Sequence, residues 1–245
     1  MLINNKETKM KKIITAIMFV ALSTVSSNAI GLPQGLSLTG GLAANQGVFG
    51  ASATQTNYND VTASQIDNTK KEGGVFTDSY GSQFIELGIG QWISIGYEHT
   101  PDSVSTPTNK SREGKAEEAV VSVDFNDMNT TYLKLNLPVL NGAYVKAGTI
   151  ETDLDIKEVM GSGSTYKNVS TEGTMMAVGY QSFLGESGFG IRFEGGYMEL
   201  DNVTTSNGVA VDGQTLANGG RNQIDAKNLE GATAKIAITY TFGRN

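Results

Sequence analysis

The stretch Ala232–Phe242, ATAKIAITYTF, decides the fold class of this chain. Read in steps of two, one face carries Ala234, Ile236, Ile238, Tyr240 and Phe242. The other face carries Lys235, Ala237, Thr239 and Thr241. Such alternation predicts a β-strand with one apolar and one polar face. Two aromatic residues end the apolar face, as they do where a membrane strand reaches the lipid headgroups. The stretch therefore favours a strand of a membrane barrel over a strand of a soluble sheet.

Composition excludes several classes of protein. The 245 residues include 30 Gly, one His and no Cys, so the chain has neither disulfides nor thiolate metal sites. A net charge of −7 argues against general nucleic-acid binding, which needs a basic surface. No apolar run approaches the roughly 18 to 20 residues of a membrane helix. A membrane location would therefore require a closed barrel, because only helices and closed sheets satisfy their backbone groups in lipid.

Residues 1–29 have the pattern of a secretory signal peptide. Lys9, Lys11 and Lys12 form a basic start, and residues 13–22 form an apolar core. Small residues at 27–29 then provide a cleavage site, and Met10 is an alternative start. We expect export, with residues 30–245 as the mature domain.

The rest of the chain alternates between apolar–polar strands and polar connections. The predicted strands cover residues 35–50, 80–87, 91–99, a fourth strand that ends at 137, then 143–156, 174–183, 188–200 and the closing strand. Long polar connections at 51–79, 100–118, 157–173 and 201–228 alternate with short turns at 88–90, 138–142 and 184–187. All short turns therefore lie at one end and all long loops at the other. This asymmetry is typical of outer-membrane barrels, with short periplasmic turns and long extracellular loops. The predicted fold is all-β, an eight-stranded antiparallel transmembrane β-barrel.

Seven charged residues fall on the polar faces of these strands: Glu86, Glu98, Lys134, Lys146, Arg192, Glu194 and Lys235. Four are positive and three negative, and near-balance suits a narrow lumen in which they pair, because unpaired buried charges are costly. The alternative, a soluble barrel such as a lipocalin, would place its apolar residues inside and its charges outside. Six aromatic residues on the opposite faces are the expected lipid-facing girdle: Tyr97, Phe189, Phe193, Tyr197, Tyr240 and Phe242.

The pattern resembles the small outer-membrane barrels of the OmpA/OmpX type, and in detail compact outer-membrane barrels of marine bacteria. The terminal strand of such barrels usually ends on an aromatic residue, and here Phe242 is followed by a three-residue tail. The resemblance covers nearly all of residues 30–245 and implies an outer-membrane protein. It also implies contact with outer-membrane lipids and lipopolysaccharide, and recognition of the terminal strand by the barrel-assembly machinery.

The sequence offers little for catalysis or metal binding. His99 could serve a lipid-modifying site with Ser103 and Glu98. However, Glu98 and His99 point to opposite faces of one strand, so a rim histidine without a catalytic role is expected. Residues 124–129 lack the ligand spacing of a calcium loop. We expect no enzyme activity, no cofactor and no metal.

Two functions remain open on the sequence alone. The first is a structural barrel whose lumen is closed by paired charges and whose loops can meet an extracellular ligand or a phage. The second is a narrow pore for ions or small solutes, with Lys134, Arg192 and Glu194 as its gate. It would depend on space left by the inward glycines Gly41, Gly96, Gly148, Gly179 and Gly196.

Overall fold

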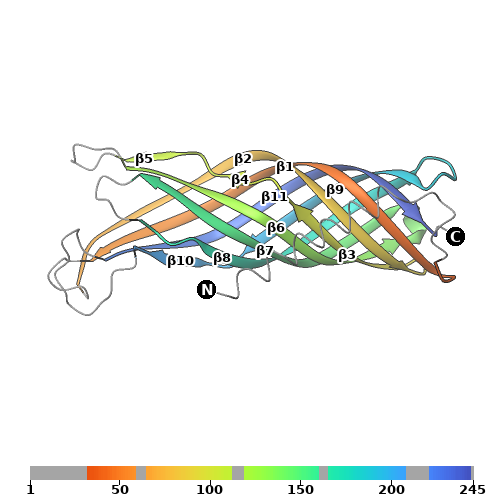
Figure 1. Ribbon diagram of the computed structural model, residues 1–245, viewed down its shortest axis with the longest axis horizontal. Helices are drawn as coiled ribbons and strands as arrows, with labels where there is room; N and C mark the ends of the chain where they lie inside the picture. The colour runs from red at the N-terminus through yellow and green to blue at the C-terminus, as the bar shows by residue number, and fades with distance from the viewer. Residues whose placement is uncertain (1–31, 59–64, 112–118, 160–164, 208–220, 244–245) are drawn as a thin grey trace.

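The computed structural model describes residues 32–58, 65–111, 119–159, 165–207 and 221–243. The expected signal peptide, residues 1–29, lies outside these ranges. Eight long strands of the described residues close into a barrel (Figure 1). They are β1 (Leu36–Tyr58), β2 (Ile66–Ile89), β3 (Ile93–Thr100), β6 (Ala119–Leu137), β7 (Ala143–Val159), β8 (Val169–Phe183), β9 (Phe189–Leu200) and β11 (Asn222–Phe242). The prediction of an eight-stranded antiparallel barrel is confirmed.

Each strand pairs with its neighbour in the chain, and β11 pairs with β1 to close the ring. The register of the closure runs from Leu38 opposite Phe242 to Asn57 opposite Asn222. Three short strands extend the wall at the loop end: β4 (Val104–Ser105), β5 (Asn109–Ser111) and β10 (Val203–Ser206). A closed ring leaves no long free sheet edge, so the backbone is satisfied within the wall.

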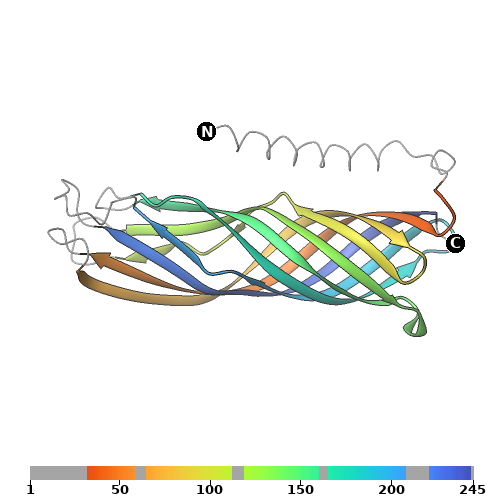
Figure 2. The same ribbon diagram turned by 90° about the horizontal axis from the view of Figure 1, so that it is seen from below.

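The short turns all lie at one end of the barrel (Figure 2). Gly90 turns the chain between β2 and β3 with φ of 62°. The 3₁₀ turn η1 (Pro138–Leu140) joins β6 to β7 and ends with Asn141 and Gly142, both at positive φ. Glycine adopts this backbone conformation without steric cost, which makes these tight reversals possible. None of the helical segments in the described residues is long and apolar enough to cross a membrane.

The strands are longer than the sequence predicted. Residues 51–58 and 66–79 were expected in a loop but continue β1 and β2 as a paired ladder. Their outer face is polar, which resembles a loop in composition, while Phe49 and Phe76 pack together on the inner face with ring centroids 5.4 Å apart. The same correction applies to residues 222–228, which belong to β11, and to residues 169–173, which belong to β8.

Two β-bulges interrupt the alternation about midway along the barrel. On β6 the register shifts between Asn126 and Asn129, with Asp127 at φ of 49°. On β11 it shifts near Asn228, at φ of 53°. Asn and Asp tolerate this left-handed backbone better than most residues do. Each bulge inserts one extra residue and so re-aims the side chains that follow. We call the barrel between the short turns and the bulges the turn-side half, and the remainder the loop-side half.

The wall is sealed by side chains where β2 leaves its neighbour. The β2–β3 ladder ends at Gln83 opposite His99, after which β4 and β5 pair with β6. Beyond that point, the Asp102 carboxylate accepts a hydrogen bond from the Gly81 amide at 3.1 Å. The Asp78 carboxylate accepts one from the Ser105 amide at 3.0 Å. Carboxylates thus replace ladder bonds along this seam.

Candidate functional site

The seven charged side chains of the polar faces all enter the lumen of the turn-side half. Six are almost fully buried, and the side chain of Lys235 is 8% exposed. They come from six different strands, so closure of the barrel brings them together. They form two groups, one nearer the short turns and one nearer the bulges.

The group nearer the turns is centred on Glu86. Arg192 donates to both of its carboxylate oxygens, at 2.7 and 2.8 Å, in a bidentate pair. Lys134 donates to one oxygen at 2.5 Å and the Tyr132 hydroxyl to the other at 2.9 Å. Arg192 also donates to the Gln181 side-chain oxygen at 2.8 Å. We call Glu86, Lys134 and Arg192 the lower ion group.

The group nearer the bulges contains two carboxylates and two ammonium groups. Lys146 lies 3.0 Å from Glu98 and 3.2 Å from Glu194. Lys235 lies 2.7 Å from Glu98 and 3.1 Å from Glu194. The Ser82 hydroxyl adds a hydrogen bond to Glu98 at 2.7 Å. We call Glu98, Glu194, Lys146 and Lys235 the upper ion group.

Two tyrosines join the ion groups into one network. Tyr132 donates to Glu86 in the lower group, while Lys146 of the upper group lies 3.9 Å from its ring centroid. Tyr144 donates to Glu194 at 2.9 Å, and Lys134 lies 5.4 Å from its ring centroid. A cation over a ring face is attracted by the ring quadrupole. Lys134 and Lys146 lie opposite each other in the ladder, yet each has its own carboxylate partner.

Aromatic side chains occupy the space over three of the five inward glycines. A methyl group built on Gly41 would lie 2.2 Å from the Phe84 ring. The same test gives 2.3 Å at Gly96, from Tyr132, and 2.2 Å at Gly179, from Tyr144. These three glycines therefore make room for ring side chains in the lumen. They do not provide the open path that the pore hypothesis required. Phe84 is 1% exposed, and its ring centroid lies 4.6 Å from the guanidinium carbon of Arg192.

The lumen of the loop-side half contains an apolar core. Its core comprises Phe49, Tyr80, Val104, Phe125, Met128, Ile150, Leu154, Met198, Leu200, Val203 and Leu229. Burying each large apolar side chain contributes about 1.5 to 3 kcal/mol. A small apolar cavity of about 30 Å³ lies within this core. Most of these residues lie within the predicted strands, and only Val104 and Val203 fall in predicted loops, but the sequence did not indicate that their side chains meet in the lumen.

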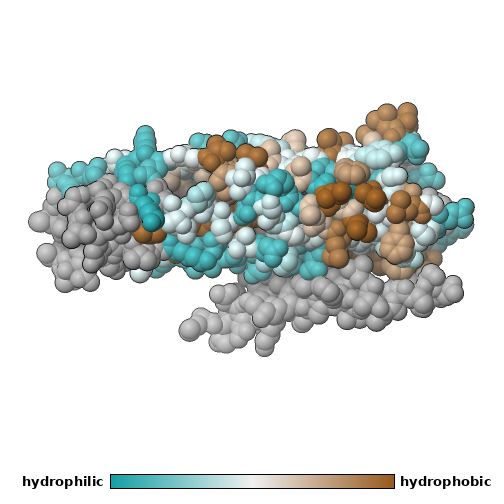
Figure 3. Space-filling view, turned by 90° about the horizontal axis from the view of Figure 1, so that it is seen from above, coloured by the Kyte–Doolittle hydropathy of each residue, from teal (hydrophilic) through white to brown (hydrophobic). Residues whose placement is uncertain are grey.

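The outer surface changes character at the level of the bulges. Turn-side outward positions are apolar, and Ile236, Ile238 and Met176 are at least half exposed. Hydrophobic side chains gather at this end in Figure 3, while hydrophilic ones prevail toward the loop end. At the bulges the outward positions become Glu151, Glu172, Glu199 and Glu230, all exposed. The apolar part of β11, residues 232–242, matches the about 9 to 11 residues of a membrane-spanning strand.

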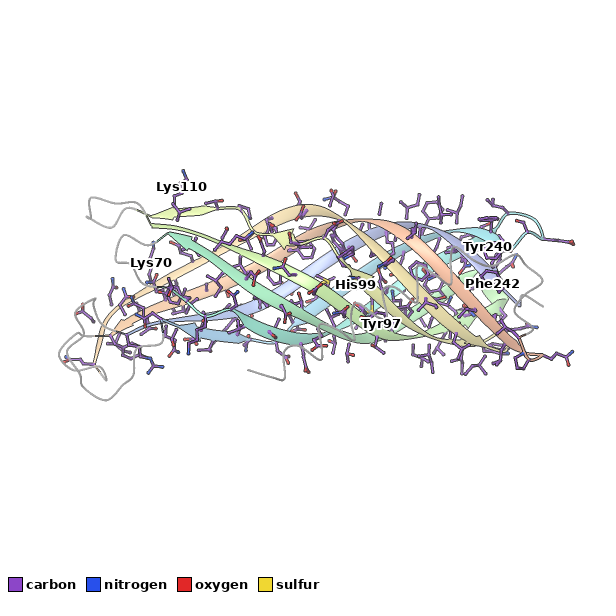
Figure 4. The ribbon with its side chains drawn as sticks, in the orientation of Figure 1. Lys70, Tyr97, His99, Lys110, Tyr240 and Phe242 are labelled. Atoms are coloured by element: carbon purple, nitrogen blue, oxygen red, sulfur yellow. The ribbon has the colours of Figure 1, made fainter. Side chains whose placement is uncertain are left out.

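The six girdle residues lie at three heights. Phe189, Tyr240 and Phe242 form an edge-to-face cluster at the turn end, with ring centroids 4.8 and 4.5 Å apart along it (Figure 4). Tyr97 and Tyr197 lie near the bulges, where the Tyr197 hydroxyl donates to Glu230 at 2.5 Å. Phe193 lies between the two levels on β9. Trp92, which was not among the predicted girdle residues, is 60% exposed beside the turn at Gly90.

His99 lies at the end of β3, about midway along the barrel (Figure 4). Its Nδ1 is 2.8 Å from the Asn129 side-chain oxygen, which also accepts from the Tyr97 hydroxyl at 2.6 Å. Because that oxygen can only accept, Nδ1 carries the proton. Glu98 points into the lumen instead and is held by Lys146 and Lys235, so it is no partner for His99.

One ion pair lies on the outer face of the loop-side half. The Lys157 ammonium donates to the Asp124 carboxylate, and this hydrogen bond lowers the pKa of Asp124 below its ordinary value of 3.8. The pair is part of a polar surface in which Asn126 donates to Asp155 at 2.9 Å. Across the described residues, no group of three or more His, Asp or Glu side chains is arranged to hold a metal ion.

Comparison with known proteins identifies the fold. No family model matches the sequence, and no curated protein matches it. Among solved structures, the outer membrane protein OprG from Pseudomonas aeruginosa matches with a TM-score of 0.52 and 12% identity, over 82% of this chain and 96% of that one. AlkL in lipid bilayers matches at 0.41 and 11%, over 90% and 96% of the two chains. The outer membrane protease OmpT from Escherichia coli matches at 0.41 and 10%, over 89% and 100%. The chain has the fold of the small β-barrels of the bacterial outer membrane.

Proposed function

We propose that this protein is a closed outer-membrane barrel that anchors a loop-side structure at the cell surface. The observation that supports the proposal is that side chains fill the lumen at two levels. The ion network with Phe84, Tyr132 and Tyr144 fills the turn-side half. An apolar core fills the loop-side half. Eight strands enclose an interior just wide enough for side chains, so filling at two levels favours a wall without a channel.

Single-channel recording tests the closed lumen. The refolded mature protein should be silent in a planar bilayer, while its heat-modifiable gel mobility shows that it is folded. Replacing Arg192 with Ala removes the guanidinium that contacts Glu86 and Phe84, yet this variant should stay silent because the apolar core still closes the loop-side half. Conductance of Arg192→Ala, with Arg221→Ala beside Tyr58 silent as the matched control, would contradict closure at two levels. Steady ohmic steps from the wild-type protein would instead support the narrow pore.

The surface role requires the loop-side half to face the outside of the cell. The chain has no Cys, so single cysteines can be labelled without background. Val75→Cys, at a position 75% exposed on β2, should react with a membrane-impermeant maleimide on intact cells. Leu140→Cys in the turn at η1, 62% exposed, should react only after the outer membrane is opened. The reverse pattern would contradict the proposed orientation.

The proposed role is not enzymatic. His99 bonds an amide oxygen, and the adjacent carboxylate Glu98 is bound by two lysines inside the lumen.

The proposed partners are those of a surface-exposed membrane barrel. Outer-membrane lipids and lipopolysaccharide would surround the outward apolar positions of the turn-side half, which we call the lipid belt, and an extracellular ligand or phage would bind at the loop end. We also propose that the assembly machinery recognises the end of β11. Phe242→Ala should then lower the amount of assembled barrel in cells more than Phe193→Ala does.

A further inference from the structure

The buried ion network carries an excess positive charge. Four cationic and three anionic side chains of the described residues lie in the turn-side lumen. Tyr132 and Tyr144 link the two groups, each by a hydrogen bond to a carboxylate of one group and a cation–π contact with a lysine of the other. The upper ion group contains two carboxylates and two lysines and is neutral. The lower ion group contains one carboxylate and two cations. One unit of positive charge is therefore unmatched, and it belongs to the lower group.

The single carboxylate of the lower group has no accepting capacity left. One oxygen of Glu86 accepts from Tyr132 and Arg192, and the other from Lys134 and Arg192. These four hydrogen bonds use the roughly four lone-pair positions of a carboxylate. A further acceptor for the cations must come from another group.

Hydrogen-bond donors without an acceptor remain in and beside the lower ion group. Arg192 is 1% exposed, and its Nε has no hydrogen-bond partner among the described residues. A buried donor without a partner is costly, and more so in a charged group. The Thr239 hydroxyl, also 1% exposed, accepts from Gln181 at 3.3 Å and keeps its own proton to donate. Gln181 in turn accepts from Arg192, so Thr239 lies close to the guanidinium. The side chain opposite Arg192 in the β9–β11 ladder is the small Ala237.

We propose that the lower ion group binds one small monovalent anion, of which chloride is the natural example. Arg192 Nε donates to it, the Thr239 hydroxyl is available as a second donor, and its charge offsets the unmatched cation. A water molecule could satisfy Nε but would leave the buried charge uncompensated, which is the larger cost. The single excess charge and the small neighbouring side chains select a halide over sulfate or phosphate. Binding of this anion does not depend on whether the lumen conducts.

Unfolding at fixed ionic strength tests the site. The refolded barrel is titrated with denaturant in lipid vesicles while sodium chloride replaces sodium gluconate, an anion too large to enter. Because chloride would bind the folded state, each tenfold rise in chloride above its dissociation constant should raise the folded-to-unfolded ratio tenfold. Equal stability in the two salts would overturn the proposal.

Two variants locate the effect. Lys134→Met removes the excess charge but keeps the length of the side chain, and its stability should no longer depend on chloride. Lys146→Met, in the neutral upper group, is the matched control and should keep the tenfold dependence. Chloride dependence that survives in Lys134→Met and disappears in Lys146→Met would place the anion elsewhere and contradict the assignment.

Direct detection avoids reliance on variants that fold poorly. Crystals of the wild-type protein grown in sodium bromide should show an anomalous bromide peak within hydrogen-bonding distance of Arg192 Nε. A lower ion group without such a peak would mean that the network is neutralised differently, by loss of the Lys134 proton, and would overturn the proposal.

Discussion

The two halves of the barrel share one continuous wall but bury side chains of opposite character. In the turn-side half, ions and hydroxyls lie inside and Ile236, Ile238 and Phe193 lie outside. In the loop-side half, Phe125, Leu154 and Leu200 lie inside and the outward face is polar, as in a soluble barrel. The difference shows that alternation alone does not determine whether the polar or the apolar face of a strand points inward. The surrounding solvent determines it, since lipid requires an apolar outer surface and water permits a polar one.

The two bulges lie where one arrangement gives way to the other. On β6, the inward residues are Lys134 and Tyr132 on the turn side of the bulge, and Phe125 on the loop side. The inward residues change from even-numbered to odd-numbered because Asp127 and Met128 together occupy one position of the ladder with β7. The shift lets the strand keep pairing with β7 while its side chains are re-aimed.

The largest effect should follow removal of the carboxylate of the lower ion group. Glu86→Ala would leave Arg192 and Lys134 buried without it and should reduce the free energy of unfolding by about 3 to 5 kcal/mol. Denaturant unfolding in vesicles measures this loss. Glu172→Ala, on the exposed outer face, is the control and should change stability by less than about 0.5 kcal/mol. Equal effects of the two variants would break the distinction between inside and outside.

A slightly smaller effect is expected from a charge on the lipid belt. Ile236→Lys should cost about 2 to 4 kcal/mol, because the ammonium would face hydrocarbon near the membrane midplane. Val75→Lys places the same charge on the outer face of the loop-side half, and its stability in the same assay should match that of wild type. If Val75→Lys were the more damaging variant, the halves would have been assigned to the wrong solvents.

A modest effect is expected from one methylene of the loop-side core. Ile150 is 2% exposed, so Ile150→Val should cost about 0.5 to 1.5 kcal/mol through lost burial and an unfilled space. Val75→Ala, at an exposed site, should cost less than the core change. A core variant as harmless as the surface one would show that the loop-side lumen is not closely packed.

The smallest expected effect depends on pH and concerns the outer face of the loop-side half. The hydrogen bond from Lys157 lowers the pKa of Asp124, so the pair stabilises the fold above pH 3.8. That contribution is lost as the pH falls below 3.8 through the lowered pKa. Lys157→Met should raise the pKa of Asp124 toward 3.8, as measured by NMR titration of its carboxyl carbon. Lys227→Met, elsewhere on the loop-side half, should leave that titration unchanged.

Much of the fold followed from local pattern, and much of the interior did not. Alternation and the positions of short turns were sufficient to predict eight antiparallel strands, and they assigned seven charges to the polar faces. The partners of those charges depend on strands far apart in the chain, such as Arg192 with Glu86. The loop-side parts of β1, β2 and β11 were assigned to loops because their outer face resembles a loop in composition. A bulge such as that at Asp127 breaks the period of two without a distinct sequence signal.

The hydrogen bond between Thr39 and Thr241 joins residues 202 positions apart, at the junction of β1 and β11. That junction has the greatest sequence separation of all the paired strands in the wall. The entropy cost of closing so long a loop arises before the contacts of the junction form, and this makes folding slow for all-β chains. The rate at which this barrel forms should therefore be set by closure, and variants that weaken the β1–β11 ladder should slow assembly more than equally destabilising variants in the β6–β7 hairpin.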